Sequence, residues 1–467
     1  MARRVVVVGG GISGLAAAWE LSAAAQFLRD PSEITVLEAS DRFGGMLRSE
    51  DLSGRVVDMG ADGFLGRRPE ATELCREVGL GEKLVPIAAR GASVWSRGRL
   101  RALPEGYAMG IPTRFWPTAR SGVIGVRGSA ALARDALLPR PDVRGPIGDR
   151  AIGPLVARKL GRRVVDQLAD PLIGGIHAGS VDDMSAAAVF PPLLAAAHRR
   201  GSLMRSLRAE TPKPDPDGPP LFWALEGGMT ALVQALSAAL ERRGVQLETS
   251  SSVDGLERDG HSWMLTGARE MRADAVVLTL AAPITSRLLR PHDDETSALL
   301  ASIDYASVTV VTFRAAAESL PGDLFGTGFL VPRHPAPRGR EPWAVTACTY
   351  LDRKWPHLAR DGEVLLRASL GRIDDTRADE WTDAECAARA WDELGVLMKL
   401  TGQPTTWVVA RHPQAFPQYR VHHLLRTAGV EAAVARLGGL AVAGSAYRGV
   451  GIPACIASGR AAARAVS

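Results

Sequence analysis

A glycine fingerprint near the start of the chain predicts a phosphate-binding turn. The run Gly9-Gly10-Gly11-Ile12-Ser13-Gly14 contains the pattern G-x-G-x-x-G. In this pattern the first glycine permits a tight turn, the second lets the backbone approach a pyrophosphate, and the third lets a helix pack closely on a strand. Glu38 follows at a spacing suited to a ribose, where its carboxylate would accept hydrogen bonds from the hydroxyls and repel a 2′-phosphate. These residues indicate a dinucleotide other than NADP.

The flanking sequence supplies the elements that must position this turn. Residues 5–8 are a continuous valine run, which is typical of a strand buried on both faces. Residues 15–21 predict a helix, and residues 34–37 predict a second strand that ends at Glu38. The order of strand, glycine turn, helix, strand and acid is that of a βαβ unit, which brings the phosphates to a helix N-terminus.

A second glycine pair follows the acid in Asp41-Arg42-Phe43-Gly44-Gly45. At this spacing the segment resembles the FAD-binding amine oxidase and porphyrinogen oxidase superfamily. The resemblance implies that FAD is held without a covalent bond and that Arg42 neutralises its pyrophosphate. A surface ion pair is the alternative role for Arg42.

The resemblance also implies that the FAD domain is discontinuous. A helix is expected from Glu226-Gly227-Gly228-Met229 to Leu240, strands over 245–253, and a buried strand over 273–280. In the superfamily pattern Val253 presents its backbone to the adenine. A strand over 440–443, a small-residue loop over 444–453 and an alanine-rich helix would cover the flavin. The implied cofactor contacts are Gly9, Gly10, Gly11, Ile12, Ser13, Gly14, Glu38, Ala39, Arg42, Gly44, Gly45, Met46, Gly60, Ala61, Asp62, Gly63, Val253, His412, Gly444, Val450, Gly451 and Ile452.

The predicted fold class is α/β and α+β, with a discontinuous Rossmann-like FAD-binding domain, a mixed-sheet substrate domain and a helical insert. The FAD-binding domain is expected at 1–80, 221–283 and 406–467. A mostly helical insert is expected at 81–210, with helical patterning over 152–168. Residues 211–220 are rich in proline and predict an exposed linker, and residues 284–405 predict the substrate-binding domain.

Segments outside the FAD motifs are similar to the bacterial porphyrinogen oxidases of haem synthesis, above all the Gram-positive coproporphyrinogen III oxidase type. These segments are Met109–Thr113, Pro171–Gly179, Gly326–Leu330, Thr346–Thr349, Lys354–His357, Pro417–Tyr419 and Gly449–Pro453. The resemblance implies a six-electron oxidation of a tetrapyrrole in three two-electron steps. The flavin would take a hydride, and oxygen would then reoxidise the flavin with release of hydrogen peroxide.

Several residues are candidates for substrate contact under this resemblance. Arg68 falls where a lysine thought to meet the substrate often stands, so it would bind a propionate; a solvated surface arginine is the alternative. Thr327, Phe329 and Leu330 would line the macrocycle site unless they only pack a hairpin. Asp62 is a candidate general base, and a turn-forming role is its alternative.

Two histidines depart from the pattern of these oxidases. His412 stands where a tryptophan often flanks the flavin, and His177 replaces a usual tyrosine. His177 could act as a base, although a satisfied structural histidine is the simpler interpretation.

Composition limits the remaining possibilities. The chain has 467 residues with 56 basic and 51 acidic side chains, and the basic ones are spread along its length, which argues against nucleic-acid binding. Four scattered cysteines without a CxxC pair favour a cytoplasmic protein without a zinc site or disulfide framework. No other metal is expected. At most a peripheral membrane contact is expected: apolar residues mixed with arginine between Met109 and Leu138 would touch a bilayer surface. The alternative is that these residues form the wall of a substrate channel or part of the core.

Four functions remain open at this point. Coproporphyrinogen III oxidation leads, and protoporphyrinogen IX oxidation is the alternative within the same family. Flavin amine oxidation and non-catalytic binding of FAD or porphyrin are the others. A transient handoff to a chelatase is implied only by the place of these oxidases in haem synthesis.

Overall fold

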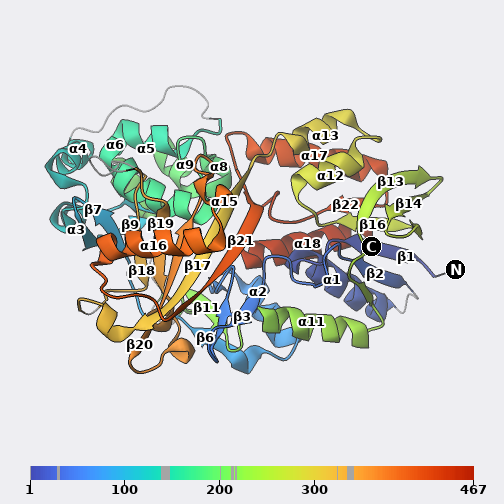
Figure 1. Cartoon of the computed structure of the whole chain (residues 1–467). Coiled ribbons are helices and arrows are strands. Elements are labelled where there is room, and N and C mark those ends of the chain that lie inside the picture. Colours follow the sequence, from blue (N-terminus) through green and yellow to red (C-terminus); the bar gives the residue numbers. More distant parts are fainter. Residues whose placement is uncertain are drawn as a thin grey trace. The chain divides into compact units, whose positions relative to one another are not determined.

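The computed structural model of the chain describes residues 2–28, 32–137, 148–199, 201–211, 215, 218–322, 324–333 and 341–467 (Figure 1). The chain forms two compact units. Unit 1 comprises Met1–Pro86, Pro219–Asp304 and Leu424–Ser467, and unit 2 comprises Ile87–Gly218 and Tyr305–His423. Most of the predicted helical insert (87–210) and of the predicted substrate-binding segment (305–405) therefore shares unit 2. Residues 81–86 and 284–304 of those segments belong to unit 1 instead, and residues 406–423, predicted for the FAD-binding domain, belong to unit 2.

Unit 1 is built on a five-stranded parallel sheet in the order β12-β2-β1-β16-β22. Its strands are β1 (Arg4–Val8), β2 (Glu33–Leu37), β12 (Gln246–Glu248), β16 (Ala275–Leu278) and β22 (Leu440–Val442). The valines of β1 are almost fully buried, as expected for a central strand flanked by parallel neighbours. Strands from the beginning, middle and end of the chain thus pair in one sheet.

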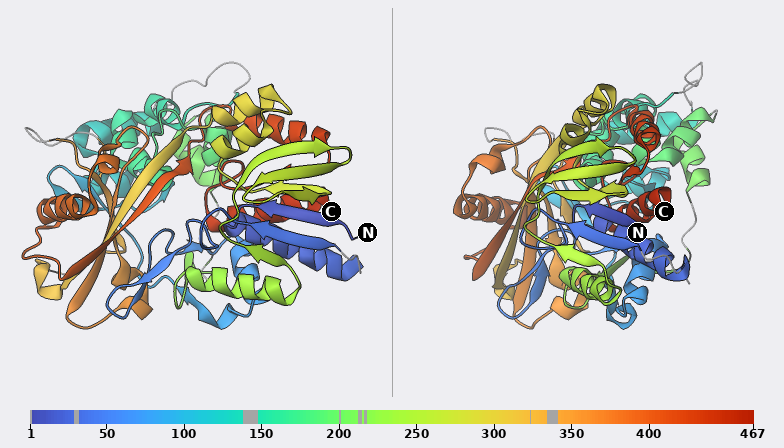
Figure 2. Two further views of the ribbon diagram at one scale, coloured as in Figure 1. Left: turned by 45° about the vertical axis from the view of Figure 1, so that its right-hand side comes forward. Right: turned by 90° about the vertical axis from the view of Figure 1, so that its right-hand side faces the viewer.

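Helices from both ends of the chain pack together beside this sheet. The helices α1 (Ile12–Leu28) and α18 (Ile452–Val466) lie side by side (Figure 2). The other helices of unit 1 are α2 (Pro69–Glu77), η1 (Gly81–Lys83), α11 (Thr230–Arg242), α12 (Ala282–Leu289), α13 (Asp294–Ala301) and α17 (His423–Leu437). Small sheets complete it: β3 (Ser49–Asp51) with β4 (Val56–Asp58); β5 (Phe64–Leu65) with β11 (Phe222–Leu225) and β6 (Leu84–Pro86); and β13 (Val253–Asp259), β14 (Ser262–Gly267) and β15 (Met271–Ala273).

Unit 2 contains a seven-stranded mixed sheet in the order β21-β17-β20-β19-β18-β7-β8. Its strands are β7 (Ser93–Ser96), β8 (Arg99–Ala102), β17 (Tyr305–Ala316), β18 (Gly328–Leu330), β19 (Val345–Tyr350), β20 (Glu363–Leu370) and β21 (Thr406–Pro417). Only the pairing of β18 with β7 is parallel. The helix α16 (Asp383–Met398) begins with a capping box at Thr382 and Glu385 and packs its apolar side on this sheet.

A second core of unit 2 lies among its helices. These are α3 (Phe115–Ser121), α4 (Gly125–Leu137), α5 (Ile152–Leu160), α6 (Arg162–Val164), α7 (Gly175–His177), α8 (Ala186–Val189), α9 (Pro191–His198) and α10 (Leu203–Glu210). Shorter elements are β9 (Tyr107–Ala108), β10 (Ile111–Pro112), η3 (Ala317–Ser319), α14 (Leu351–Lys354), η4 (Pro356–Leu358) and α15 (Arg377–Glu380). No helix in the described ranges is long and apolar enough to cross a membrane.

The predicted helical stretch over 152–168 is interrupted in the structure. Helix α5 ends at Leu160, because the φ of +90° at the following Gly161 lies outside the helical region. After the single turn of α6, the segment η2 (Val165–Gly174) winds as a π-helix that contains Pro171. Most of the linker predicted at 211–220 lies outside the described residues.

Candidate functional site

The glycine loop of unit 1 is shaped by close backbone approaches. Gly9 has a φ of +106°, which favours glycine, and a Cβ on Gly14 would lie 1.9 Å from the carbonyl oxygen of Gly9. By contrast, a Cβ on Gly11 would meet nothing within 4 Å. The first and third glycines therefore serve packing within the protein, whereas the second borders open space where a phosphate can approach the backbone.

Glu38 is tied directly to this loop. Its carboxylate accepts a hydrogen bond from the backbone N–H of Gly10 at 2.7 Å and two from Ser40, from the N–H at 2.9 Å and the hydroxyl at 2.7 Å. The carboxylate is thus held at the end of β2, beside the glycine turn. A ribose is the ligand part that such an acid binds in a dinucleotide fold.

The segment that leads to Val253 runs beside Glu38. The N–H of Ser251 donates to the backbone oxygen of Glu38 at 2.8 Å, and the N–H of Ser250 donates to that of Ser40 at 2.7 Å. Val253 itself is half-buried at the start of β13 and pairs with Gly267. The structure therefore brings the predicted adenine and ribose contacts close together within unit 1.

Thr279, which directly follows β16 within the buried strand predicted over 273–280, also fixes the glycine loop. Its hydroxyl lies 3.0 Å from the carbonyl oxygen of Val8 and 2.8 Å from that of Gly9. The hydroxyl therefore donates to backbone oxygens at the end of β1, from the residue that follows the neighbouring strand β16. The role of this threonine was not anticipated from the sequence, which predicted only a buried strand over 273–280.

Arg42 holds the second glycine segment. Its guanidinium donates to the backbone oxygens of Phe43, Gly45 and Leu47 at 3.3, 2.6 and 3.2 Å. It therefore braces its own loop, which includes Gly44 with a φ of +108°. The predicted contact of Arg42 with a pyrophosphate stays a prediction.

The C-terminal helix joins the same site through a close contact with α1. A Cβ on Gly459 would lie 2.0 Å from the carbonyl oxygen of Ser13, so only glycine allows α18 to approach the glycine-loop helix this closely. The N–H of Gly444 donates to the Ser458 hydroxyl at 3.1 Å, which anchors the preceding loop. Burial raises the pKa of the Cys455 thiol to about 11, so it is protonated and unreactive at neutral pH.

A polar network that the sequence did not reveal holds α11 in place. Asp58 accepts hydrogen bonds from the Ser49 hydroxyl at 2.6 Å and from the N–H of Met229 at 2.7 Å. The N–H of Ser49 donates in turn to the Thr230 hydroxyl at 2.7 Å. These bonds connect the β3–β4 hairpin to the start of α11, and only the adjacent glycine pair hinted at this turn.

Arg68 is exposed just before α2 and pairs with Glu70 at 2.7 Å. Although burial opposes the change, the hydrogen bond from Arg68 lowers the pKa of the Glu70 carboxyl. The charge of Arg68 also acts on the Cys455 thiol, which puts this arginine near the start of α18. Asp62 is buried at 9% exposure, two residues before Phe64 of β5.

The three residues predicted to line the macrocycle site separate in unit 2. Phe329 is only 1% exposed and belongs to the core between the sheet and α16. Leu330, the next residue of β18, faces the helical core, and Thr327 donates from its N–H to the backbone oxygen of Gly91 at 3.0 Å. Successive side chains of a strand point to opposite faces, so Phe329 and Leu330 cannot line one surface.

The two atypical histidines also belong to unit 2. His177 is 7% exposed, and its Nδ1 atom has no hydrogen-bond partner among the described residues. Burial lowers the pKa of His177 to about 4, so its imidazole is neutral at pH 7. His412 is half-buried in β21, opposite Val308. Its predicted position beside a flavin stays a prediction.

The other predicted cofactor residues lie on the segments already described in unit 1. They are Ile12, Ser13, Ala39, Met46, Gly60, Ala61, Gly63, Val450, Gly451 and Ile452. The site fits a dinucleotide cofactor on three observations of unit 1: the open backbone at Gly11, the acid at the end of β2, and glycine-only packing at Gly14 and Gly459.

Comparison with known proteins agrees with this geometry. The family described as flavin containing amine oxidoreductase matches residues 12–467. Coproporphyrinogen III oxidase of Mycobacterium tuberculosis (strain H37Rv) is 36% identical over 464 residues, covering 98% of this chain and 96% of that protein. Coproporphyrinogen III oxidase of Bacillus subtilis (strain 168) is 31% identical over 470 residues, covering 98% and 97%. A solved structure from Exiguobacterium sp. 255-15, provisionally named a protoporphyrinogen oxidase, has a TM-score of 0.88 and 31% identity, covering 100% and 99%.

The fold and the cofactor site define a flavin-dependent oxidoreductase. The chain belongs to the family of flavin-containing amine oxidoreductases, which confirms the predicted superfamily. The prediction that FAD is its cofactor is confirmed as well.

Proposed function

We propose that this protein oxidises coproporphyrinogen III to coproporphyrin III, with FAD as cofactor and molecular oxygen as the final electron acceptor. The observation that carries the proposal is the full-length similarity to two proteins named coproporphyrinogen III oxidase, at 36% and 31% identity. The similarity spans both units, so it includes more than the dinucleotide fold that many flavoproteins share.

The proposed reaction removes six electrons in three equal steps. In each step a meso carbon–hydrogen bond of the substrate breaks, two electrons leave with that hydrogen as a hydride, and the substrate releases one proton. Over the three steps two of these protons come from ring nitrogens and the third, after tautomerisation, comes from the fourth meso carbon. FAD, when bound, supplies the chemistry of hydride acceptance, and oxygen takes up the two electrons and two protons as hydrogen peroxide.

The protein has to bind and orient the two partners of this reaction. In unit 1, Gly11, Glu38 and the start of α18 would hold the cofactor, since each borders the cradle formed by the glycine loop. Arg68 offers an exposed guanidinium, which matches the geometry of a propionate carboxylate. Leu330 can contribute apolar contact, whereas the burial of Phe329 assigns that side chain to the core.

The direct test follows porphyrin fluorescence and hydrogen peroxide after coproporphyrinogen III is added in air to the FAD-loaded protein. We expect enzyme-dependent fluorescence and close to three peroxide molecules per porphyrin. A rate equal to autoxidation without enzyme would refute the proposal. Flavin bleaching under anaerobic conditions by amines but not by the porphyrinogen would favour amine oxidation instead.

The role of Arg68 has its own test with a matched control. Replacing Arg68 by Gln should raise KM for coproporphyrinogen by roughly tenfold, because one charge-assisted hydrogen bond contributes about 1.5–3 kcal/mol. Arg67→Gln removes the same charge from the exposed neighbouring position and should leave KM nearly unchanged. Equal effects of the two variants would show that only the overall charge matters.

Protoporphyrinogen IX oxidation remains the second candidate because the similar Exiguobacterium structure carries that provisional name. Its substrate has two propionates rather than four and more apolar surface. The same fluorescence assay with protoporphyrinogen IX distinguishes the two substrates. A handoff of product to a chelatase stays a prediction.

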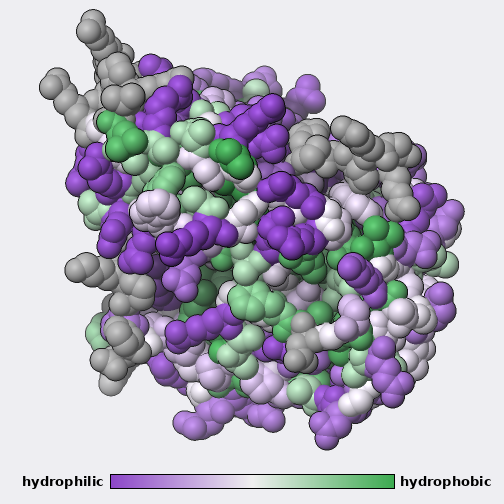
Figure 3. Space-filling view, turned by 90° about the vertical axis from the view of Figure 1, so that its left-hand side faces the viewer, coloured by the Kyte–Doolittle hydropathy of each residue, from purple (hydrophilic) through white to green (hydrophobic). Residues whose placement is uncertain are grey.

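Peripheral membrane contact is the remaining proposal about location. Trp116, Val126 and Leu137 on α3 and α4 are 65%, 84% and 78% exposed. The space-filling view from that side shows hydrophobic side chains among many hydrophilic ones (Figure 3). Leu138, the end of the stretch predicted to touch a bilayer, lies outside the described residues. Cosedimentation with liposomes at low and high salt should detect contact, and no pelleting in either condition would rule it out.

A further inference from the structure

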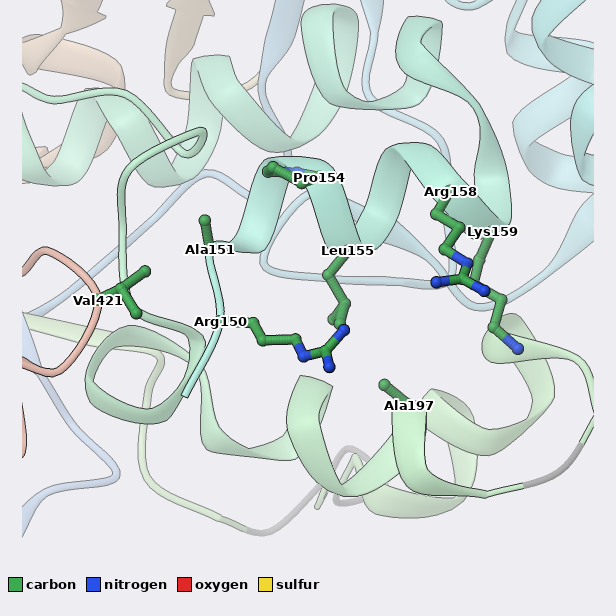
Figure 4. Close-up of a pocket in the computed structure, with 8 residues that line it drawn as sticks. All are labelled: Arg150, Ala151, Pro154, Leu155, Arg158, Lys159, Ala197 and Val421. Atoms are coloured by element: carbon green, nitrogen blue, oxygen red, sulfur yellow. The ribbon is translucent and has the colours of Figure 1, made fainter. Parts of the chain in front are cut away.

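A cavity of about 420 Å³ lies among the helices of unit 2, apart from every residue discussed above as a cofactor or substrate contact. One face of α5 forms its upper wall, as drawn in Figure 4. The cavity is lined by Arg150, Ala151, Pro154, Leu155, Arg158, Lys159, Ala197 and Val421. Its volume lies within the range of about 300–1,000 Å³ that small-molecule sites usually have.

The lining combines three cations with apolar walls. In Figure 4 the side chains of Arg150, Arg158 and Lys159 extend from the α5 side toward α9, which carries Ala197. Lys159 is only 6% exposed, an unusual degree of burial for a lysine. The described lining contains no acidic side chain. Arg158 and Lys159 also interact with other groups of the protein, so an anion would join a cationic lining that contains no acidic side chain to repel it.

The position of Arg150 is fixed by its neighbour. Asp149 accepts hydrogen bonds from the Ser185 hydroxyl at 2.6 Å, from the N–H of Ala187 at 3.1 Å and from the N–H of His422 at 2.7 Å. Asp149 thereby holds together the strand-like segment that carries Arg150 and the loop that carries Val421. Two segments that line the cavity are thus joined by the hydrogen bonds of one half-buried aspartate.

We propose that this cavity is a binding site for an aliphatic monocarboxylate of the fatty-acid class. The carboxylate would accept hydrogen bonds from the guanidinium groups of Arg150 and Arg158, since a guanidinium matches a carboxylate in shape and charge. The aliphatic chain would contact Leu155 and cover the exposed Pro154 and half-buried Val421, whose apolar surface a small inorganic anion would leave in water. The site is separate from the proposed oxidation and does not depend on it.

Isothermal titration of the FAD-loaded protein with decanoate tests this inference. We expect one decanoate per chain, with decanol and inorganic phosphate each binding at least tenfold more weakly. Arg150→Gln and Arg158→Gln should each weaken decanoate about tenfold. Arg163→Gln, at an exposed position on α6 outside the lining, is the matched control and should bind like the wild type.

A variant that keeps all charges tests the location independently. Ala197→Leu places extra volume in the cavity and should also weaken decanoate, even if an arginine variant fails to fold. The flavin absorption spectrum and Tm report folding for each variant. The proposal is overturned if decanoate does not bind, if decanol binds equally well, or if binding survives both Arg158→Gln and Ala197→Leu.

Discussion

The hydrogen bond between Glu38 and the glycine loop gives the sharpest test of the cofactor site. Replacing Glu38 by Gln keeps one acceptor oxygen, which can still serve Ser40, but turns an NH₂ group toward the N–H of Gly10. The lost charge-assisted hydrogen bond of 2.7 Å is worth about 1.5–3 kcal/mol. Because the loop must be ordered to receive the pyrophosphate, this loss should fall on FAD binding.

The assay is titration of the apoprotein with FAD, followed by quenching of flavin fluorescence. At about 1.4 kcal/mol per factor of ten, Glu38→Gln should raise the Kd for FAD by roughly 10–100-fold. Glu33→Gln is the matched control, since Glu33 begins the same strand and its exposed side chain pairs with the exposed Arg4. The reasoning fails if Glu38→Gln binds FAD as tightly as the wild type, or if the control is weakened equally.

Two further predictions concern packing and pH. Gly459→Ala would place a Cβ 2.0 Å from the Ser13 oxygen, so we expect a loss of about 1–3 kcal/mol and a lower Tm with FAD bound; Gly395→Ala on α16 meets no atom and should leave Tm unchanged or raise it. Burial lowers the pKa of His177 from 6.5 to about 4, so between these pH values the unfolded chain binds a proton at this histidine and the folded protein does not. The free energy of unfolding therefore falls by roughly 3 kcal/mol as the pH drops from 6.5 toward 4. Denaturant titrations across this range should show a weaker acid dependence for His177→Gln, whereas replacement of the exposed His261 should change nothing.

The parallel sheet of unit 1 was predictable because its signals are local. Continuous apolar runs mark β1, β2 and β16, and the glycine fingerprint fixes the turn between β1 and α1. The seven-stranded sheet was harder to anticipate. Its strand β7 lies in a region predicted to be mostly helical and pairs with β18 more than 200 residues later. Such pairing leaves no pattern in either short segment.

The site residues likewise divide into those with a local sequence signal and those brought together from distant segments. Glu38 was predicted from its spacing alone. The sequence placed it after the second strand of the βαβ unit but did not predict its hydrogen bond to the N–H of Gly10. Thr327, Phe329 and Leu330 were predicted to line one surface. The resemblance identifies residues by their position in the sequence and does not indicate toward which face of the sheet each side chain points. The Asp58 network leaves no pattern in the sequence, since its hydrogen-bonded partners are separated by up to 181 residues.

The ratio of kcat/KM for coproporphyrinogen III to that for protoporphyrinogen IX tests the central claim most directly. Both substrates would be given in air, at matched concentrations, to the FAD-loaded protein, with autoxidation subtracted. The account predicts a clear preference for coproporphyrinogen III that shrinks in Arg68→Gln. A preference for protoporphyrinogen IX, or no acceleration of either substrate by a protein that holds FAD, would contradict it.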